Sequence, residues 1–291
     1  MKPDVAIIGP GRVGQTLGRL LFQAGYPVVA VSGLREESAR AAVAFIGSGQ
    51  VLPAIPAAES AELILVTTPD RAIPYVEAAL VYSRLRPGAV VAHTSGLLSS
   101  RVLEYVRNGP GHPAIASAHP LQSFARPEEA VERLAGVTWA LEGDERALAV
   151  LEQVVLDLGG RPVRISTDGK PLYHAAASVA SNFLVALLGA AVRLGESAGL
   201  PREEVVPALL PLVQGTLANV ARLGPVEALT GPIARGDVST VAAHLGAIRA
   251  SLPDLEPLYL AMGRETLSVA RRKASFPHEA APELERLLGR G

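Results

Sequence analysis

The sequence predicts an α/β protein in which an N-terminal doubly wound domain precedes an all-α C-terminal domain. Up to about residue 166, short apolar runs alternate with helix-forming segments. That alternation is typical of a parallel sheet covered by helices on both faces. Beyond Thr167 the apolar runs of strand type stop, and Gly and Pro separate helical segments. Because 291 residues suffice for about two domains, we expect domains at 1–167 and 168–291.

The strand-forming runs are nearly continuous in apolar residues, as in strands buried on both faces. They are Val5–Ile8, Val28–Ser32, Leu63–Thr67, Val90–His93, Ile115–Ala118, Thr138–Leu141 and Val163–Ile165. The helices between them are expected at Val13–Gln23, Glu36–Ile46, Arg71–Tyr82, Ser99–Val106 and Asp144–Leu158. In the C-terminal domain, helices are expected at Pro171–Ala198, Pro201–Leu223, Val226–Leu229, Val238–Ser251, Glu256–Lys273 and Glu279–Leu288.

The first strand leads into the glycine pattern Gly9-Pro10-Gly11-Arg12-Val13-Gly14. Gly9 permits a tight turn, Gly11 permits the backbone to approach a pyrophosphate, and Gly14 permits the next helix to pack closely. The helix that begins near Arg12 would offer its free N–H groups and its positive dipole end to the same group. The pattern lies between a strand and an amphipathic helix, so it predicts a dinucleotide site; the alternative is a structural turn.

The end of the second strand indicates which dinucleotide is bound. Proteins that bind NAD normally place an acidic residue here to contact the ribose hydroxyl. This chain has Ser32-Gly33-Leu34-Arg35 instead, and a hydroxyl with a guanidinium suits the 2′-phosphate of NADP. We therefore expect NADP rather than NAD, the alternative being that Arg35 only caps a solvated turn. Thr67, Thr68 and Pro69, which follow the third expected strand, should line the same cofactor.

Candidate catalytic residues come from both domains. Ser95 and His119 follow strands, and clefts form beyond the carboxyl ends of strands in such sheets. Lys170, His174 and Asn182 are spaced by multiples of four on one helix, and such a polar stripe should face a wet cleft or a ligand. Histidine can supply the proton that accompanies hydride transfer, with Lys170 as another candidate donor.

Each of these candidates also has a structural alternative. Ser95 could simply form a turn, and His119 could belong to a structural His-Pro turn. Lys170 could be solvated while Asn182 bonds the other domain. If the catalytic interpretation holds, Ser95 and Asn182 orient the substrate between the two imidazoles.

Composition excludes several classes of partner and chemistry. The formal charge of −1 argues against nucleic acid and anionic membranes. The absence of cysteine excludes disulfides and thiolate sites and is compatible with the cytoplasm; no metal site is expected. The uncharged stretch Ala175–Val192 is just long enough to span a membrane, but we expect a central buried helix. Its apolar sides and those of Pro201–Leu223 predict a homodimer.

Five segments together resemble the bacterial family of Rossmann-like NADP oxidoreductases whose C-terminal helical domain has no known function. They are the glycine pattern at 9–14, His93–Gly96, His119–Phe124, Tyr173–Ala177 with Asn182, and Leu229–Asp237. The resemblance implies an NADP-type Rossmann domain and dimerisation through a helical domain similar to that of 6-phosphogluconate dehydrogenase. It implies no particular substrate.

More distantly, the chain is similar to prephenate dehydrogenase, pyrroline-5-carboxylate reductase and 2-dehydropantoate reductase. His119-Pro120 is placed like the His-Pro of prephenate dehydrogenases, whose histidine contacts the substrate hydroxyl. The Lys-x-x-x-Asn spacing of ketopantoate and hydroxyacid reductases is absent, because position 174 is His. This departure shifts weight from Lys170 to the histidines.

The sequence thus predicts a cytoplasmic NADP-dependent oxidoreductase. It would transfer a hydride between NADP(H) and a C=O, C=N or hydroxyl group of a small polar metabolite. The alternative is a protein that binds NADP(H) without turnover and reports its state to a partner.

Overall fold

The computed structural model describes residues 1–289, which form two compact units divided between Ala180 and Ser181. The first unit extends past the boundary expected at residue 167. It includes helix α8 (Lys170–Ala180), whose first residue is fully buried.

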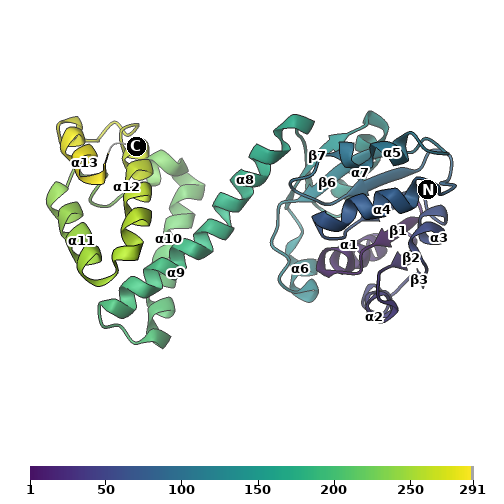
Figure 1. The fold of residues 1–291 in the computed structure, drawn as a ribbon, viewed down its shortest axis with the longest axis horizontal. Coiled ribbons are helices and arrows are strands. Elements are labelled where there is room, and N and C mark those ends of the chain that lie inside the picture. Colours follow the sequence, from purple (N-terminus) through teal and green to yellow (C-terminus); the bar gives the residue numbers. More distant parts are fainter. Residues whose placement is uncertain (290–291) are drawn as a thin grey trace. The chain divides into compact units, whose positions relative to one another are not determined.

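The first unit contains one eight-stranded sheet in the order β3-β2-β1-β4-β5-β6-β7-β8. Figure 1 shows helices such as α1 (Arg12–Gln23) and α4 (Ile73–Leu80) beside this sheet. The strands are β1 Val5–Ile8, β2 Val28–Ser32, β3 Gln50–Val51, β4 Leu63–Val66, β5 Val90–His93, β6 Ala114–Pro120, β7 Thr138–Gly143 and β8 Arg161–Arg164. The strand order reverses between β1 and β4, where Ile8 pairs with Val66. Ligands bind beyond the carboxyl ends of the strands at such a reversal, so the fold itself marks the crevice beside Gly9 and Thr67.

One strand pair differs from the rest of this sheet. Strand β7 runs antiparallel to β6, with Ser117 opposite Glu142 and His119 opposite Ala140, whereas every other pair is parallel. The apolar run that predicts β7 carries no information on direction, so the sequence does not reveal this reversal.

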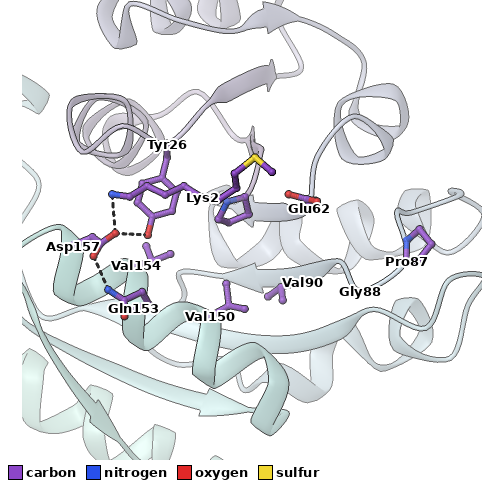
Figure 2. Close-up of a pocket in the computed structure, with 12 residues that line it drawn as sticks. Lys2, Tyr26, Glu62, Pro87, Gly88, Val90, Val150, Gln153, Val154 and Asp157 are labelled. Atoms are coloured by element: carbon purple, nitrogen blue, oxygen red, sulfur yellow. Dashed lines mark hydrogen bonds and ion pairs between the residues drawn. The ribbon is translucent and has the colours of Figure 1, made fainter.

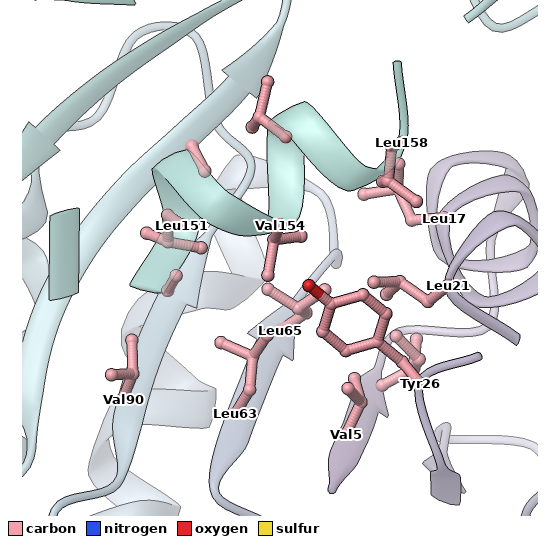
Figure 3. Close-up of a cluster of buried hydrophobic side chains, with 14 of the residues drawn as sticks. Val5, Leu17, Leu21, Tyr26, Leu63, Leu65, Val90, Leu151, Val154 and Leu158 are labelled. Atoms are coloured by element: carbon pink, nitrogen blue, oxygen red, sulfur yellow. The ribbon is translucent and has the colours of Figure 1, made fainter. Parts of the chain in front are cut away.

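The helices of the first unit cover both faces of the sheet. They are α1 Arg12–Gln23, α2 Glu36–Ile46, α3 Ala54–Glu59, α4 Ile73–Leu80, α5 Glu104–Arg107, α6 Pro127–Arg133 and α7 Glu145–Asp157, followed by α8. On one face, Leu21 of α1 and Val154 of α7 meet Leu63 and Leu65 of β4 (Figure 3). Ile64 of the same strand packs into the cluster on the opposite face, as alternation along a buried strand requires. The expected doubly wound domain is confirmed.

The second unit is helical, as expected, with α9 Asn182–Ser197, α10 Arg202–Ala228, α11 Val238–Ser251, α12 Glu256–Ala270 and α13 Ala281–Leu288. Gly224 has a φ of +75° and breaks α10, which agrees with the separate helices expected on either side. The core of the unit lies among α11, α12 and α13, around Leu245, Leu267 and Leu284.

The expectation of a central buried helix at Ala175–Val192 is wrong. This segment spans α8 and α9, and its large side chains are exposed, Phe183 by 57% and Val185 by 69%. The apolar pattern of this segment therefore does not lead to burial within the described part of the chain. Thr167–Ser197 and Arg202–Ala228 are long and apolar enough to cross a membrane by length and composition, with mean hydropathies of 1.9 and 1.3 over an 18-residue window in each.

Candidate functional site

Two glycines of the loop between β1 and α1 are required by the fold. Gly9 has a φ of +117°, and a β-carbon on it would lie 2.6 Å from the backbone nitrogen of Thr68. A β-carbon on Gly14 would collide with the carbonyl of Gly9. These positions let β1, β4 and the start of α1 approach closely, as the sequence predicts.

Gly11 is different, because nothing in residues 1–289 requires glycine there. Its backbone is extended, with φ −77° and ψ −172°, a conformation open to any residue. A β-carbon would meet no atom within 4 Å, and the residue caps α1 without a side-chain hydrogen bond. The first amides of α1 have no intrahelical acceptor, so Gly11 leaves open space directly in front of free N–H groups. This arrangement fits a phosphate group held against the loop.

The end of β2 presents one buried and one exposed polar residue. Ser32 is buried and its carbonyl accepts a hydrogen bond from the amide of Gly9 at 2.9 Å. Arg35 is exposed, and within residues 1–289 its guanidinium makes no ion pair or side-chain hydrogen bond. The nearby carboxylate of Glu36 is paired with Arg40, so it does not engage Arg35. Arg35 is thus available to an anionic ligand.

Of the residues that follow β4, Thr67 has a structural hydrogen bond, whereas the Thr68 hydroxyl is available to a ligand. The Thr67 hydroxyl donates to the carbonyl of Gly9 at 2.7 Å and so fastens the glycine loop to the sheet. The Thr68 hydroxyl oxygen is buried and has no hydrogen-bond partner in the described part of the chain. Buried hydroxyls normally have partners, so this atom beside the β1–β4 crevice fits a polar group of a bound molecule. Pro69 is exposed next to it.

Two imidazoles meet at the carboxyl edge of the sheet, beside Gly96. A β-carbon on Gly96 would lie 2.5 Å from Cδ2 of His174 and 3.0 Å from Nε2 of His119. The two rings contact edge to face, with centroids 6.2 Å apart. The structure therefore brings together the histidines that the sequence singles out, and the absence of a side chain at Gly96 makes their approach possible.

Tyr173 completes this group, although no sequence pattern indicates its role beyond its place in a family motif. Its hydroxyl lies 2.9 Å from Nδ1 of His119. Burial lowers the pKa of His119 to about 4, with contributions from the charges of Lys170 and His174. Burial also raises the pKa of Tyr173 to about 12. A neutral imidazole can accept the phenolic hydrogen at Nδ1, and in that tautomer its own N–H is at Nε2, on the side of Gly96.

The structure favours the turn interpretation of Ser95. Its hydroxyl oxygen accepts hydrogen bonds from the amides of Leu97 and Leu98, at 3.1 and 2.9 Å. Its carbonyl accepts from Lys170 Nζ at 2.8 Å. Neighbouring His93 is also fully buried, with its ring bonded to the backbone of Ser95 and Ser99. These residues build the loop that carries Gly96.

Lys170 does not lie in a wet cleft, so that expectation is wrong. The residue is fully buried, and its ammonium bonds the Ser95 carbonyl and the Ser117 hydroxyl. Burial lowers the pKa of Lys170 to about 8, while the carboxylates of Glu142 and Asp70 oppose the shift. A group with no exposed surface has no direct route to a substrate. Asn182 begins α9 in the second unit and is exposed, and its role stays a prediction.

A separate pocket of about 670 Å³ lies at the amino ends of β1, β4 and β5 (Figure 2). There the carboxylate of Asp157 is bonded by Lys2 at 2.8 Å, Tyr26 at 2.9 Å and Gln153 at 2.7 Å. These bonds fasten the end of α7 to the N-terminal segment. The pocket is at the edge opposite to the one where this fold class binds ligands, so we assign it a structural role.

Comparison with known proteins agrees with both units. Residues 1–116 match the Rossmann-like domain family, and residues 137–266 match a domain of unknown function, DUF2520. The two matches are adjacent along the sequence, a Rossmann-like domain followed by a DUF2520 domain. No curated protein matches the sequence.

Several solved structures are similar over nearly the whole chain. Protein TM1727 from Thermotoga maritima is 27% identical, with a TM-score of 0.74 over 92% of this chain and 98% of that one. BF3122 from Bacteroides fragilis, which is described as a candidate NADP oxidoreductase, is 24% identical. Its TM-score is 0.73 over 92% of this chain and 98% of that one. A reductive aminase from Aspergillus terreus is 17% identical, with a TM-score of 0.66 over 98% and 99%.

The fold is also shared with a prephenate dehydrogenase from Aquifex aeolicus and a 1-pyrroline-5-carboxylate reductase from Streptococcus pyogenes, at 18% and 15% identity. The Rossmann-like and DUF2520 matches agree with the two-domain family resemblance noted from the sequence.

Proposed function

We propose that this protein is an NADP(H)-dependent oxidoreductase that acts on a C=O, C=N or hydroxyl group of a small polar metabolite. The observation that carries the proposal is the open space at Gly11, in front of the free amides of α1 and without any internal reason for glycine. The imidazole pair at the same edge of the sheet supports catalysis rather than binding alone.

The cofactor residues have separate tasks in this proposal. The pyrophosphate is held by the loop and the start of α1, at Gly11, Arg12 and Val13. The Thr68 hydroxyl gains a hydrogen-bond partner on the bound cofactor. The nicotinamide supplies or accepts the hydride when it is bound. Similar structures contain NADPH in the Aspergillus terreus reductive aminase and NAD⁺ in an imine reductase variant from Myxococcus stipitatus. The preference for NADP therefore rests on this chain's own Ser32 and Arg35.

The proton that accompanies reduction comes from His119 and Tyr173. Nε2–H of neutral His119 hydrogen-bonds the substrate oxygen or nitrogen that becomes basic as the hydride adds. As Nε2 gives up its proton, Nδ1 takes the phenolic proton of Tyr173, so the imidazole stays neutral and the negative charge ends on the phenolate. An alkoxide is a stronger base than a phenolate, so this transfer is downhill. His174 borders the same space and orients the substrate.

Arg35→Ala should weaken NADPH binding by about 1 to 3 kcal/mol and leave NADH binding almost unchanged, because only NADPH offers a phosphate for a charge-assisted hydrogen bond. Titration calorimetry with both cofactors measures the difference. Arg40→Ala is a matched control, since that arginine is paired with Glu36 on the same helix. An equal loss for the two cofactors would remove Arg35 from the site.

We also propose a homodimer in which a second copy covers the exposed apolar side chains of α9 and α10. These include Phe183, Val185, Leu212 and Leu217, each exposed by at least half. Such apolar surface is unusual on a monomer of a soluble protein. Sedimentation at micromolar concentration should give a dimer, and Val185→Asp should shift it towards monomer. A wild-type monomer under these conditions would contradict the proposal.

The function itself is tested by a binding titration with NADPH, followed by a metabolite screen that follows NADPH absorbance at cytoplasmic pH. Binding with substrate-dependent oxidation of NADPH supports the proposal. The sensor alternative would be favoured if NADPH binds tightly and changes the binding of a protein partner, while no carbonyl or imine substrate is turned over.

A further inference from the structure

Lys170 is a buried cation for which the proposed proton transfer has no use. Its side chain has no exposed surface, and removing an ammonium from water is costly unless its surroundings compensate. The compensation comes from the Ser95 carbonyl, the Ser117 hydroxyl and, at longer range, the charge of Glu142. Glu142 is itself buried and accepts hydrogen bonds from the Ser100 amide and hydroxyl and from the Thr167 hydroxyl.

Each hydrogen-bond partner of Lys170 is close in sequence either to Gly96 or to His119, which lie together at the candidate site. Ser95 immediately precedes Gly96, and Ser117 precedes His119 by two residues on the same strand. Lys170 precedes His174 by one helical turn. One turn of four residues rises about 6 Å, and two residues of strand advance about 6.6 Å. Helix α8 and strand β6 therefore advance together by similar distances. Lys170 contacts Ser117, and about one turn further along α8, Tyr173 and His174 contact His119.

We propose that Lys170 is a positioning residue whose ammonium fastens the Ser95–Gly96 loop, strand β6 and helix α8 together, so that His119, Tyr173 and His174 meet over Gly96. This inference rests on the proposed function, and it assigns to Lys170 a role other than proton donor to the substrate. The hydrogen bonds of Lys170 hold these elements together in the free protein, before any substrate or cofactor binds.

The test compares Lys170→Met, which keeps the length of the side chain but removes its donors, with Ser117→Ala, which removes one acceptor. NMR of the imidazole nitrogens reports the pKa of His119 and its hydrogen bond to Tyr173 without cofactor or substrate. We expect Lys170→Met to raise the pKa of His119, because it removes a nearby positive charge, and to weaken the bond to Tyr173. Ser117→Ala should weaken that bond while the charge remains.

Kinetics with any substrate that the screen identifies complete the test. Lys170→Met should lower kcat about 100-fold, as expected for a misplaced reacting group, with KM and the Kd of NADPH nearly unchanged. Ser117→Ala should lower kcat in the same direction, although Ser117 is buried away from the substrate. If Lys170→Met fails to fold, Ser117→Ala still tests the proposal.

Two results would overturn the proposal. The first is an unchanged His119–Tyr173 bond in both variants. The second is rescue of Lys170→Ala turnover by added methylamine, accompanied by a normal imidazole spectrum, which would make Lys170 a direct donor. Failure of NADPH to bind the wild type would refute the proposed function. The NMR comparison of the two variants would still test the positioning role of Lys170, because it needs no cofactor.

Discussion

Replacement of Gly11 by valine should abolish measurable binding of NADPH and of NADH while the free energy of unfolding stays nearly unchanged. The extended backbone at this position accepts a β-branched residue, and a β-carbon there would lie within 4 Å of no neighbouring atom in the described part of the chain. The new side chain would instead fill the space through which a pyrophosphate reaches the amides of α1. Titration calorimetry measures the loss of affinity, and chemical denaturation measures stability.

Gly14→Val provides the matched contrast for that experiment. Its β-carbon would collide with the Gly9 carbonyl, so this variant should lose fold stability as well as cofactor binding. If Gly11→Val keeps wild-type affinity, the loop is only a structural turn and the central observation behind the proposed function is lost.

His119→Asn should lower turnover by about 10² to 10⁴ while leaving the Kd of NADPH nearly unchanged, because it removes the proposed proton donor and not a proposed cofactor contact. Tyr173→Phe removes the hydroxyl that is proposed to restore the imidazole proton, so it should lower turnover in the same direction. Steady-state kinetics and cofactor titration separate the two effects. Wild-type turnover in the His119 variant would contradict the proposed proton transfer.

The low pKa of His119 gives this prediction a dependence on pH. Since its pKa is about 4, His119 stays neutral from about pH 5 upwards, and its protonation should not reduce turnover between pH 7.5 and 5.5. The unfolded chain binds the proton more readily than the folded one, so the contribution of His119 to stability is lost as pH falls from about 6.5 towards 4. Denaturation of His119→Asn should show a smaller loss over this range. An imidazole that titrates near 6.5 by NMR would contradict both expectations.

The fold was largely predictable because its long apolar runs and glycine breaks are local signals. Strand β3 and helices α3 and α6 were missed because two to seven residues carry too little periodicity to detect. The direction of β7 depends on pairing with β6, which no local pattern encodes. The exposure of α9 was also missed, because an apolar helix looks the same in sequence whether its own chain or another molecule covers it.

The site was predictable to the extent that its residues have distinctive chemistry. The glycine pattern, His119 and His174 could be picked out from their positions after strands or along a helix. The role of Tyr173 could not, because it depends on a contact between residues 54 positions apart. The burial of Lys170 also escaped prediction, since its partners Ser95 and Ser117 carry no sign in the sequence that they accept from an ammonium.

The reversal of β7 decides where the chain enters α8. Because β8 runs parallel to β7, the chain leaves the sheet at the edge formed by the amino end of β6, opposite the ligand edge. Helix α8 therefore passes Ser117 before it reaches His119. The cofactor loop and the proposed proton-transfer group are consequently encoded in one contiguous stretch of gene that ends at Ala180. The second unit, which begins at Ser181, contributes none of the residues of the cofactor loop or of the proposed proton-transfer group.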